Sequence, residues 1–495
     1  MTVATEQRYD VVVVGAGNAG LSAAIAARER GARVLVLEKA PQEQRGGNTF
    51  FTGGLFRFPY QGIADIQALI DLAPEELETI DVGQYLPQTF TQDLLRVTEG
   101  LTDPDLMEVL VSQAYPTMRW LRERGVRWIL AYGRQAFRVE GKLRFWGGLI
   151  VEAVGGGQGL SDQEFTIAER MGIDLWYDTK ALALQTDPRG RVVGLVVRTP
   201  EGRQEVAAGA VVLACGGFEA NPEMRTRYLG PEWELAKVRG TPFNTGDGLR
   251  MALDIGAQPF GHWSSCHAVA WDLRSTPYGN RRLGDLYQKH SYPFGIIVNR
   301  EGRRFVDEGA DFRNYTYARY GREILRQPGR MAFQIFDAKV QHLLREEYRI
   351  REVTKGEAST LEELADQLAI DRDGLVRTVR EFNAAVQEGA YNPTILDGKG
   401  TRGITPPKSN WALPIDTPPF LGFAVTCGIT FTFGGLRITR RAQVLDTEDR
   451  PIPGLYAAGE IVGGLFYYNY PGGSGLMAGA VFGRTAGTSA AQDVG

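Results

Sequence analysis

The chain has 495 residues, of which 43% are hydrophobic, and its 55 basic and 59 acidic residues give a formal net charge of -4. This length exceeds one ordinary hydrophobic core, so two domains are expected. Because charges of both signs are mixed along the chain, there is no basic field for nucleic acid or an anionic membrane, and a small-molecule ligand is favoured.

The cysteines and histidines give no metal or disulfide pattern. The three cysteines are far apart without a CxxC pair, and the four histidines are scattered. We therefore predict no metal site and no disulfide framework. With no signal-peptide pattern and no run of about 18 apolar residues, we expect a cytoplasmic protein without an integral membrane segment.

The chain begins with a pattern typical of a dinucleotide-binding turn. The apolar run Val11 to Val14 suits a buried strand, and glycines at 15, 17 and 20 lead into an alanine-rich helix. Gly15 would permit a tight turn, Gly17 would let the backbone approach a pyrophosphate, and Gly20 would let the helix pack on the strand. Glu38 would end a second strand and accept hydrogen bonds from ribose hydroxyls. This motif alone leaves NAD and FAD open.

The order of segments predicts a discontinuous domain. A helix-rich, acidic stretch runs from about 62 to 130, and strands resume at 192–197 and 210–214. From about 240 the composition shifts to aromatics, arginines and polar loops, and after proline-rich joints glycine turns and short strands return. We expect a nucleotide-binding domain of residues 1–240 and 415–495, interrupted by a capping or substrate domain of residues 241–414.

Glycine-rich segments at both ends of the chain indicate a flavin. The stretch 453–460, Pro-Gly-Leu-Tyr-Ala-Ala-Gly-Glu, resembles the second flavin-binding motif of FAD oxidoreductases, in which the acid, here Glu460, contacts the ribityl chain. Residues 45–54 resemble the loop beneath the isoalloxazine ring, and residues 472–476 resemble the helix start that faces its carbonyl end. Helix amides there would stabilise negative charge on reduced flavin.

Taken together, these motifs resemble the succinate dehydrogenase/fumarate reductase flavoprotein family over essentially the whole chain. The resemblance implies an α/β fold with a Rossmann-like, glutathione-reductase-like FAD-binding domain and an inserted α+β capping domain. Members with covalent flavin carry a histidine after the first Gly-Gly pair, whereas this loop continues with Asn48, Thr49 and Phe50, so non-covalent FAD is expected. The residues assigned to FAD are Gly15, Gly17, Asn18, Ala19, Gly20, Glu38, Lys39, Gly46, Gly47, Asn48, Thr49, Gly53, Gly54, Gly216, Asp247, Gly459, Glu460, Ser474 and Leu476.

The resemblance also names candidate catalytic residues. Family chemistry pairs hydride transfer between substrate carbon and flavin N5 with proton transfer at the neighbouring carbon. Residues 298–313 resemble the fumarate reductase segment that delivers the catalytic arginine, which implies Arg313 as proton carrier and Glu308 as its relay partner. Since a guanidinium normally keeps its proton, the alternatives are that Arg313 only fixes a carboxylate, or that one of the tyrosines at 315, 317 and 320 carries the proton.

Substrate contacts are implied for His267, Tyr470, Arg313 and Ser474, and Tyr470 is also a candidate catalytic residue beside Arg313 and Glu308. Two dicarboxylate contacts of fumarate reductases are absent, because residues 429–433 read Ile-Thr-Phe-Thr-Phe and Tyr470 replaces an arginine. Tyr470-Pro-Gly resembles 3-ketosteroid dehydrogenases, in which the tyrosine donates to a substrate carbonyl. A tyrosine hydroxyl can donate to a carbonyl or a carboxylate, so both remain open.

Within the family, residues 263–271, 304–320 and 466–480 resemble tricarballylate dehydrogenase. The favoured expectation is an FAD-dependent oxidoreductase acting on a CH–CH bond beside a carboxylate or carbonyl. The alternatives are a ketosteroid-like desaturase, supported by Tyr470, Phe431, Phe433 and Phe466, an enoate reductase of the fumarate or urocanate type, and a non-catalytic flavin electron-transfer protein. The direction of reaction and a separate electron donor or acceptor stay unspecified.

Overall fold

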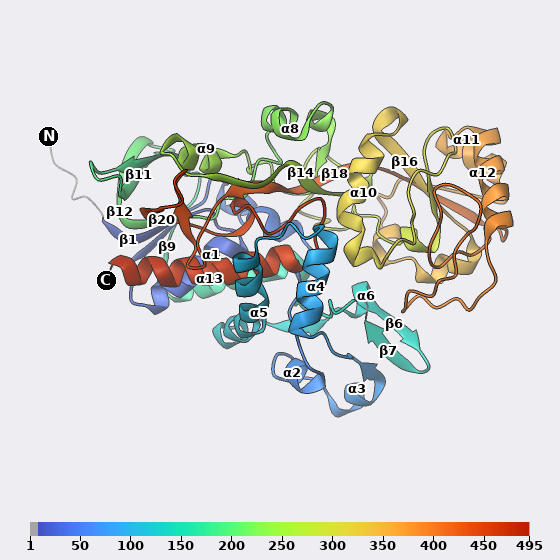
Figure 1. Cartoon of the computed structure of the whole chain (residues 1–495), viewed down its shortest axis with the longest axis horizontal. Helices are drawn as coiled ribbons and strands as arrows, with labels where there is room; N and C mark the ends of the chain where they lie inside the picture. The colour runs from blue at the N-terminus through green and yellow to red at the C-terminus, as the bar shows by residue number, and fades with distance from the viewer. Residues whose placement is uncertain (1–7, 146, 495) are drawn as a thin grey trace.

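A computed structural model describes residues 8–145 and 147–494. Figure 1 shows an elongated molecule with strand β1 (Tyr9–Val14) and the end of helix α13 (Ser474–Val494) at one extremity. Helices α11 (Leu361–Leu368) and α12 (Arg372–Ala385) lie at the opposite extremity. Both ends of the chain therefore contribute to the same body.

That body is built on an eight-stranded sheet with the order β10-β11-β12-β1-β2-β9, extended by β20 beside β12 and by β19 beside β20. The strands after β1 are β2 (Val34–Leu37), β9 (Asp174–Trp176), β10 (Lys180–Thr186), β11 (Val192–Thr199), β12 (Gly202–Leu213), β19 (Gln443–Leu445) and β20 (Pro451–Ala457). β1 runs parallel to β2 and β12, and β20 runs parallel to β12. Parallel strands buried on both faces explain the valine-rich runs.

Helix α1 (Asn18–Glu29) joins the two ends of the chain by packing against α13. Small residues make this approach possible, since a Cβ on Gly487 would lie 1.9 Å from the carbonyl oxygen of Ala23. The C-terminal helix therefore completes the glycine-turn domain, as the discontinuous arrangement predicts.

A second sheet has the order β13-β18-β16-β15, with β14 and β17 also pairing with β18. Its strands are β13 (Lys237–Val238), β14 (Pro259–Asp272), β15 (Ile296–Val298), β16 (Met331–Phe336), β17 (Lys355–Ala358) and β18 (Phe420–Leu436). The long strands β14 and β18 pair antiparallel and run side by side through the middle of the molecule (Figure 1). Because β18 lies after residue 414 and β14 before it, this sheet combines both predicted domains, and the division at 240/241 and 414/415 stays a prediction.

The remaining elements cover these sheets. The helices are α2 (Ile63–Gln67), α3 (Pro74–Thr79), α4 (Pro87–Val97), α5 (Pro104–Arg124), α6 (Tyr132–Gln135), α7 (Gly156–Arg170), α8 (Pro222–Leu229), α9 (Asp247–Asp254) and α10 (Tyr317–Leu325). Two small sheets contain β3 (Leu55–Phe56), β5 (Trp128–Leu130) and β8 (Val151–Ala153), and β4 (Ile80–Asp81), β6 (Ala136–Val139) and β7 (Lys142–Phe145). The helix-rich stretch expected from about 62 to 130 is confirmed.

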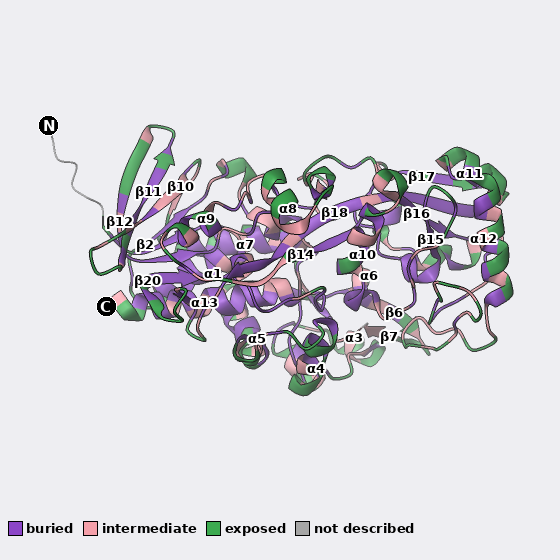
Figure 2. Ribbon diagram, turned by 45° about the horizontal axis from the view of Figure 1, so that its top comes forward, coloured by how far each residue is buried: buried purple, intermediate pink, exposed green. Residues whose placement is uncertain are grey.

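Burial follows this organisation. Figure 2 shows the central strands, α1 and much of α13 buried, whereas α11 and α12 expose much of their surface. Within residues 8–145 and 147–494, none of the helices combines the length and apolar character needed to cross a bilayer. The predicted α/β class, with a Rossmann-like body and a capping body, is confirmed.

Candidate active site

A large cavity runs from the glycine turn after β1 to the capping segment. It is lined by β1 and α1, the loop after Gly46, the start of α9, strand β18 and the first turn of α13. Every residue assigned to FAD from the sequence lines it, except Gly20, Gly46, Gly54 and Ser474.

The glycine turn has the geometry predicted for Gly15 and Gly20, while the approach of a pyrophosphate to Gly17 stays a prediction. Gly15 has φ +102°, and a Cβ there would lie 2.5 Å from the carbonyl oxygen of Ala214. A Cβ on Gly20 would lie 1.9 Å from the carbonyl oxygen of Gly15, so Gly20 serves helix packing and not the cavity wall. At Gly17, which precedes α1, the nearest atom to a Cβ would be Thr49 Oγ1 at 3.4 Å. The helix N-terminus therefore opens onto the cavity at a position suited to an anion.

Glu38 is buried at the end of β2, where the motif predicts it. Its Oε2 accepts from the Ala16 amide at 3.1 Å and its Oε1 from the Ala40 amide at 2.8 Å. These hydrogen bonds lower the pKa of Glu38, but burial outweighs them and raises it overall. Its contact with a ribose stays a prediction.

Lys39 and Asp247 form one side of the cavity through an ion pair. Lys39 Nζ lies 2.9 Å from Asp247 Oδ2, and Lys180 Nζ lies 2.7 Å from Asp247 Oδ1. Burial acts to raise the pKa of Asp247, but the hydrogen bonds from Lys180 and Lys39 outweigh it and lower the pKa to about 2. This carboxylate therefore stays ionised and anchors the start of α9 against the end of β2.

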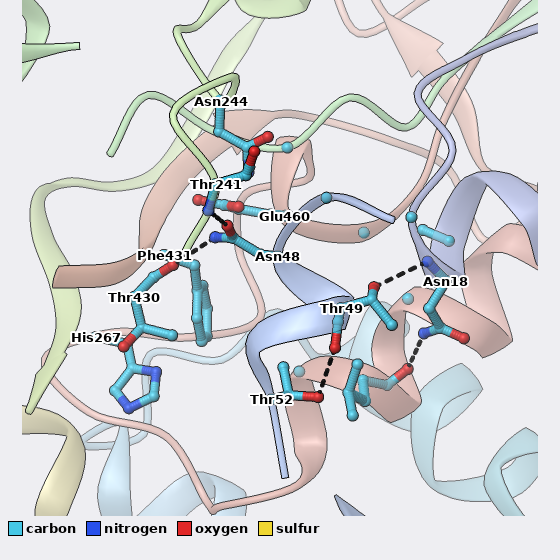
Figure 3. A pocket seen from close by; sticks show the side chains of 18 of the residues that line it. Asn18, Asn48, Thr49, Thr52, Thr241, Asn244, His267, Thr430, Phe431 and Glu460 are labelled. Atoms are coloured by element: carbon cyan, nitrogen blue, oxygen red, sulfur yellow. Dashed lines mark hydrogen bonds between the residues drawn. The ribbon is translucent and has the colours of Figure 1, made fainter. Parts of the chain in front are cut away.

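The loop after Gly46 is held in place by hydrogen bonds of the Asn48 and Thr49 side chains (Figure 3). Asn48 Nδ2 donates to the carbonyl oxygen of Thr430 at 2.8 Å, and Asn48 Oδ1 accepts from the Thr241 amide at 2.9 Å. Thr49 Oγ1 accepts from the Asn18 amide at 2.9 Å. The loop thus joins the first helix to the capping segment.

The glycines behind this loop pack against α7. A Cβ on Gly46 would lie 2.4 Å from Ser161 Oγ, and one on Gly54 would lie 2.6 Å from the carbonyl carbon of Gly156. Ser474 lies at the start of α13, and its buried Oγ has no hydrogen-bond partner among the described residues. Gly46 and Gly54 therefore shape the site from behind, and the contact of Ser474 with FAD or substrate stays a prediction.

The described residues fit FAD. Gly17 and the amides at the start of α1 line the cavity at a position suited to phosphates, and the half-buried Glu460 carboxyl lines it at a position suited to hydroxyl groups. In addition, the buried Asn18 Oδ1 has no partner among the residues the structure describes, while Asn18 Nδ2 donates to the carbonyl oxygen of Leu476 at 2.8 Å.

The far end of the cavity is aromatic and contains two histidines. The His267 ring lies 4.8 Å from Tyr470, 4.9 Å from Tyr317 and 5.2 Å from Phe431, measured between ring centroids. Neither ring nitrogen of His267 has a hydrogen-bond partner in the described part of the chain. Burial lowers the pKa of His267 and of His290 well below the usual value, so both rings are neutral.

Three guanidinium groups line the same end. Arg239 Nη2 lies 2.6 Å from Asp285 Oδ1, and Arg134 Nη1 lies 3.0 Å from Asp285 Oδ2. Arg313 Nη2 donates to the carbonyl oxygen of Arg134 at 2.6 Å, and its Nε has no partner among the described residues. Burial lowers the pKa of Arg313, and the negative charge of Glu347 offsets only part of this decrease.

Glu308 lies elsewhere. Its Oε2 forms an ion pair with Arg304 Nη2 at 2.5 Å, and its Oε1 accepts from the Ile297 amide at 2.7 Å. No hydrogen bond or ion pair joins Glu308 to Arg313 in residues 8–145 and 147–494. The structure therefore corrects the sequence-based pairing, because the nearer Arg304 occupies the carboxylate.

The structure also distinguishes the three tyrosines proposed as alternative proton carriers. Tyr317 lines the cavity, and its hydroxyl is hydrogen-bonded to that of Tyr470. Tyr315 donates to Asp93 Oδ2, and Tyr320 donates to the carbonyl oxygen of Asp307. Only Tyr317 of the three borders the cavity.

Sequence reasoning missed several residues at this end. The far end of the cavity is also lined by residues from separate segments that only the fold brings together, namely Arg134, Arg239, Asp285 and Gln288. A pair of arginines around one aspartate has no fixed spacing, so no sequence signal could have found it.

Comparisons with known proteins agree with this geometry. The family described as "FAD binding domain" matches residues 10–476. Urocanate reductase of Eggerthella lenta is 31% identical, over 97% of this chain and 74% of that protein. The 3-oxosteroid 1-dehydrogenase of Mycobacterium tuberculosis is 26% identical, over 99% of this chain and 100% of that protein. A structure of the open conformation of a flavocytochrome c3 fumarate reductase aligns with a TM-score of 0.74 at 28% identity, over 99% of this chain and 79% of that chain.

The family match spans the chain from β1 to the first turn of α13, which are the segments that meet around the cavity. The chain therefore belongs to the FAD-binding family of succinate dehydrogenase/fumarate reductase-like flavoproteins, and it is an FAD-dependent oxidoreductase that acts on CH–CH bonds.

Proposed function

We propose that the substrate is a small acid with more than one carboxylate, of the tricarballylate type, and that the enzyme introduces or removes a carbon-carbon double bond beside a carboxylate. The observation that carries this proposal is that Arg134 and Arg239, which share Asp285, line the same cavity as Arg313. Guanidinium groups are the side chains best suited to bind carboxylates in a desolvated site.

The three arginines differ in how far neighbouring acids already compensate their charge. Arg134 also lies 3.8 Å from Glu152 and 3.9 Å from Glu346, so much of its charge is compensated. Arg239 shares Asp285, whereas the acceptor for Arg313 among the described residues is a carbonyl oxygen, that of Arg134. An incoming carboxylate would therefore bind best between Arg239 and Arg313.

FAD supplies the hydride acceptor or donor when it is bound. The side chains must orient the substrate and manage one proton. We assign the proton to Arg313, since burial lowers its pKa and brings the neutral form closer than for an exposed arginine. Tyr470 and neutral His267 are assigned hydrogen bonds that orient the substrate.

A ketosteroid-type substrate is the second candidate. The ring of Phe431 lies 5.2 Å from Tyr470 and 6.0 Å from Phe466, which gives the cavity one apolar wall. Tyr470 could then donate to a neutral carbonyl oxygen.

Anaerobic bleaching of the bound flavin distinguishes these candidates. We expect propane-1,2,3-tricarboxylate, or another saturated di- or tricarboxylate, to bleach the FAD absorbance, or the matching unsaturated acid to reoxidise chemically reduced enzyme. Bleaching by 3-ketosteroids alone would contradict the proposal and favour the second candidate. No response to any acid or enone, with FAD retained, would contradict both and leave an electron-transfer role.

A further inference from the structure

A buried acid, Glu219, lies within hydrogen-bonding reach of the half-buried Glu460 carboxyl. Glu219 follows the turn Gly216-Gly217 at the end of β12, and its residue is 0% exposed. Its Oε1 accepts two hydrogen bonds, from Asn48 Nδ2 at 2.7 Å and from Asn244 Nδ2 at 2.6 Å. Its Oε2 receives no hydrogen bond from the described residues. One oxygen of this carboxyl group is therefore saturated with donors and the other has none.

The Glu460 carboxyl occupies the space next to Glu219. Its Oε1 accepts from the Thr432 amide at 2.8 Å and from Thr432 Oγ1 at 3.2 Å. A Cβ on Gly217 would lie 2.3 Å from this oxygen, so a side chain at position 217 would displace the Glu460 carboxyl. Figure 3 shows Glu460, Asn244 and Asn48 at the same corner of the cavity.

Two carboxyl groups this close in a buried site cannot both be ionised. Burial and the charge of Glu460 raise the pKa of Glu219 well above its usual value. Burial also raises the pKa of Glu460, but its hydrogen bonds with Glu219 and Thr432 act against that rise. The proton therefore resides on Glu219 and the negative charge on Glu460.

Two other titratable groups face this pair. Arg225 Nη1 donates to the carbonyl oxygen of Glu219 at 3.0 Å and to that of Ala236 at 3.1 Å, so the guanidinium is directed at the backbone. The buried Cys266 has its pKa raised well above the usual value by burial and remains a neutral thiol. Neither provides an ion-pair partner for the Glu219 carboxyl.

We propose that Glu219 is a protonated carboxylic acid whose O–H group donates to Glu460 and holds that carboxylate as a hydrogen-bond acceptor for FAD. Glu219 is then a positioning residue of the cofactor site. Because its other oxygen binds Asn48 and Asn244, it also fixes the loop after Gly46 to the segment before α9.

Infrared spectroscopy tests the protonation directly and needs no substrate. Wild-type protein at pH 8 should show a carboxylic-acid C=O band that shifts in D2O and is absent in E219Q. The matched control is E164Q, because Glu164 is a second buried acid on α7 whose pKa burial raises well above the usual value. E164Q should retain the Glu219 band. An unchanged carboxylic-acid region in E219Q would overturn the proposal.

Affinity of the apoprotein for FAD, followed by quenching of flavin fluorescence, tests the positioning role. E219Q presents an amide N–H to Glu460 and an oxygen to both asparagines, so its Kd should stay within about threefold of wild type, whereas E219A should bind FAD at least about tenfold more weakly. E219Q that binds as weakly as E219A, or that fails to fold, would overturn the proposal, since the glutamine has the shape and charge of the proposed state.

Discussion

The hydroxyl of Tyr315 donates a hydrogen bond to Asp93 Oδ2 at 2.7 Å, across 222 positions of sequence. Tyr315 ends the 3-10 turn Arg313–Tyr315, and Asp93 lies on α4. Arg57 Nη1 donates to the same hydroxyl at 3.1 Å, and Asn469 Nδ2 donates to the Tyr315 carbonyl oxygen at 2.6 Å. The turn that carries Arg313 is therefore held by residues from the two ends of the chain and not by Glu308.

Removing this hydroxyl should displace Arg313. In Y315F the hydrogen bonds to Asp93 and from Arg57 are lost, and a small misplacement of a reacting group lowers rates strongly. We expect kcat to fall by about 10- to 100-fold while FAD content and KM change little. The control is Y320F, because Tyr320 is also buried but its hydroxyl bonds to the carbonyl oxygen of Asp307 and to neither Asp93 nor Arg57. Wild-type kcat in Y315F would show that the contact does not position the turn.

Arg313 itself is tested by R313A. If it transfers the proton, turnover should fall by about 100- to 10,000-fold while the protein stays yellow, because the residue is remote from the glycine turn. R319A, at an exposed position on α10, is the matched arginine control and should behave as wild type. Normal turnover in R313A would remove the proton role.

Most residues that the sequence assigns to FAD line one cavity, because local geometry determines their positions. Gly15 needs a positive φ, and Gly20 has no room for a side chain, so both leave a signature in a short segment. Glu38 directly follows β2, and Glu460 lies in the short turn after β20. Each of these features depends on neighbours in sequence.

The substrate half was predicted less well because it depends on distant neighbours. Arg134 and Arg239 meet at Asp285 through the fold, and Glu308, which the family resemblance paired with Arg313, forms its ion pair with Arg304. Glu219 also went unnoticed, since its importance comes from the side chains that surround it.

Tyr470 can report the kind of oxygen that it binds. Burial raises the pKa of Tyr470 and of Tyr317, so both phenols are protonated hydrogen-bond donors near neutral pH. A bond to a carboxylate is worth about 1.5–3 kcal/mol, and one to a neutral carbonyl about 0.5–1.5 kcal/mol. Y470F should therefore lower kcat/KM by more than about tenfold on the proposed carboxylate substrate.

The control for this measurement is Y467F, since Tyr467 lies three positions away and does not line the cavity. A loss in Y470F of only about threefold would indicate a neutral acceptor and favour the ketosteroid-type candidate. An equal loss in Y467F would mean that the segment, and not the hydroxyl, matters.

The neutral state of His267 predicts how stability depends on pH. A histidine in an unfolded chain has a pKa of about 6.5, whereas burial keeps that of His267 well below this value in the folded protein. As the pH falls below about 6.5 the unfolded state binds a proton that the folded state does not, so the free energy of unfolding decreases by up to about 1.4 kcal/mol per pH unit. That contribution is complete above the unfolded pKa and is lost on acidification.

Measured by urea unfolding at fixed FAD concentration, the free energy of unfolding of H267Q should therefore decrease less steeply between pH 7 and 5 than that of wild type. H342Q, at an exposed position, should keep the wild-type slope. Equal slopes in H267Q and wild type would mean that His267 takes up a proton while folded.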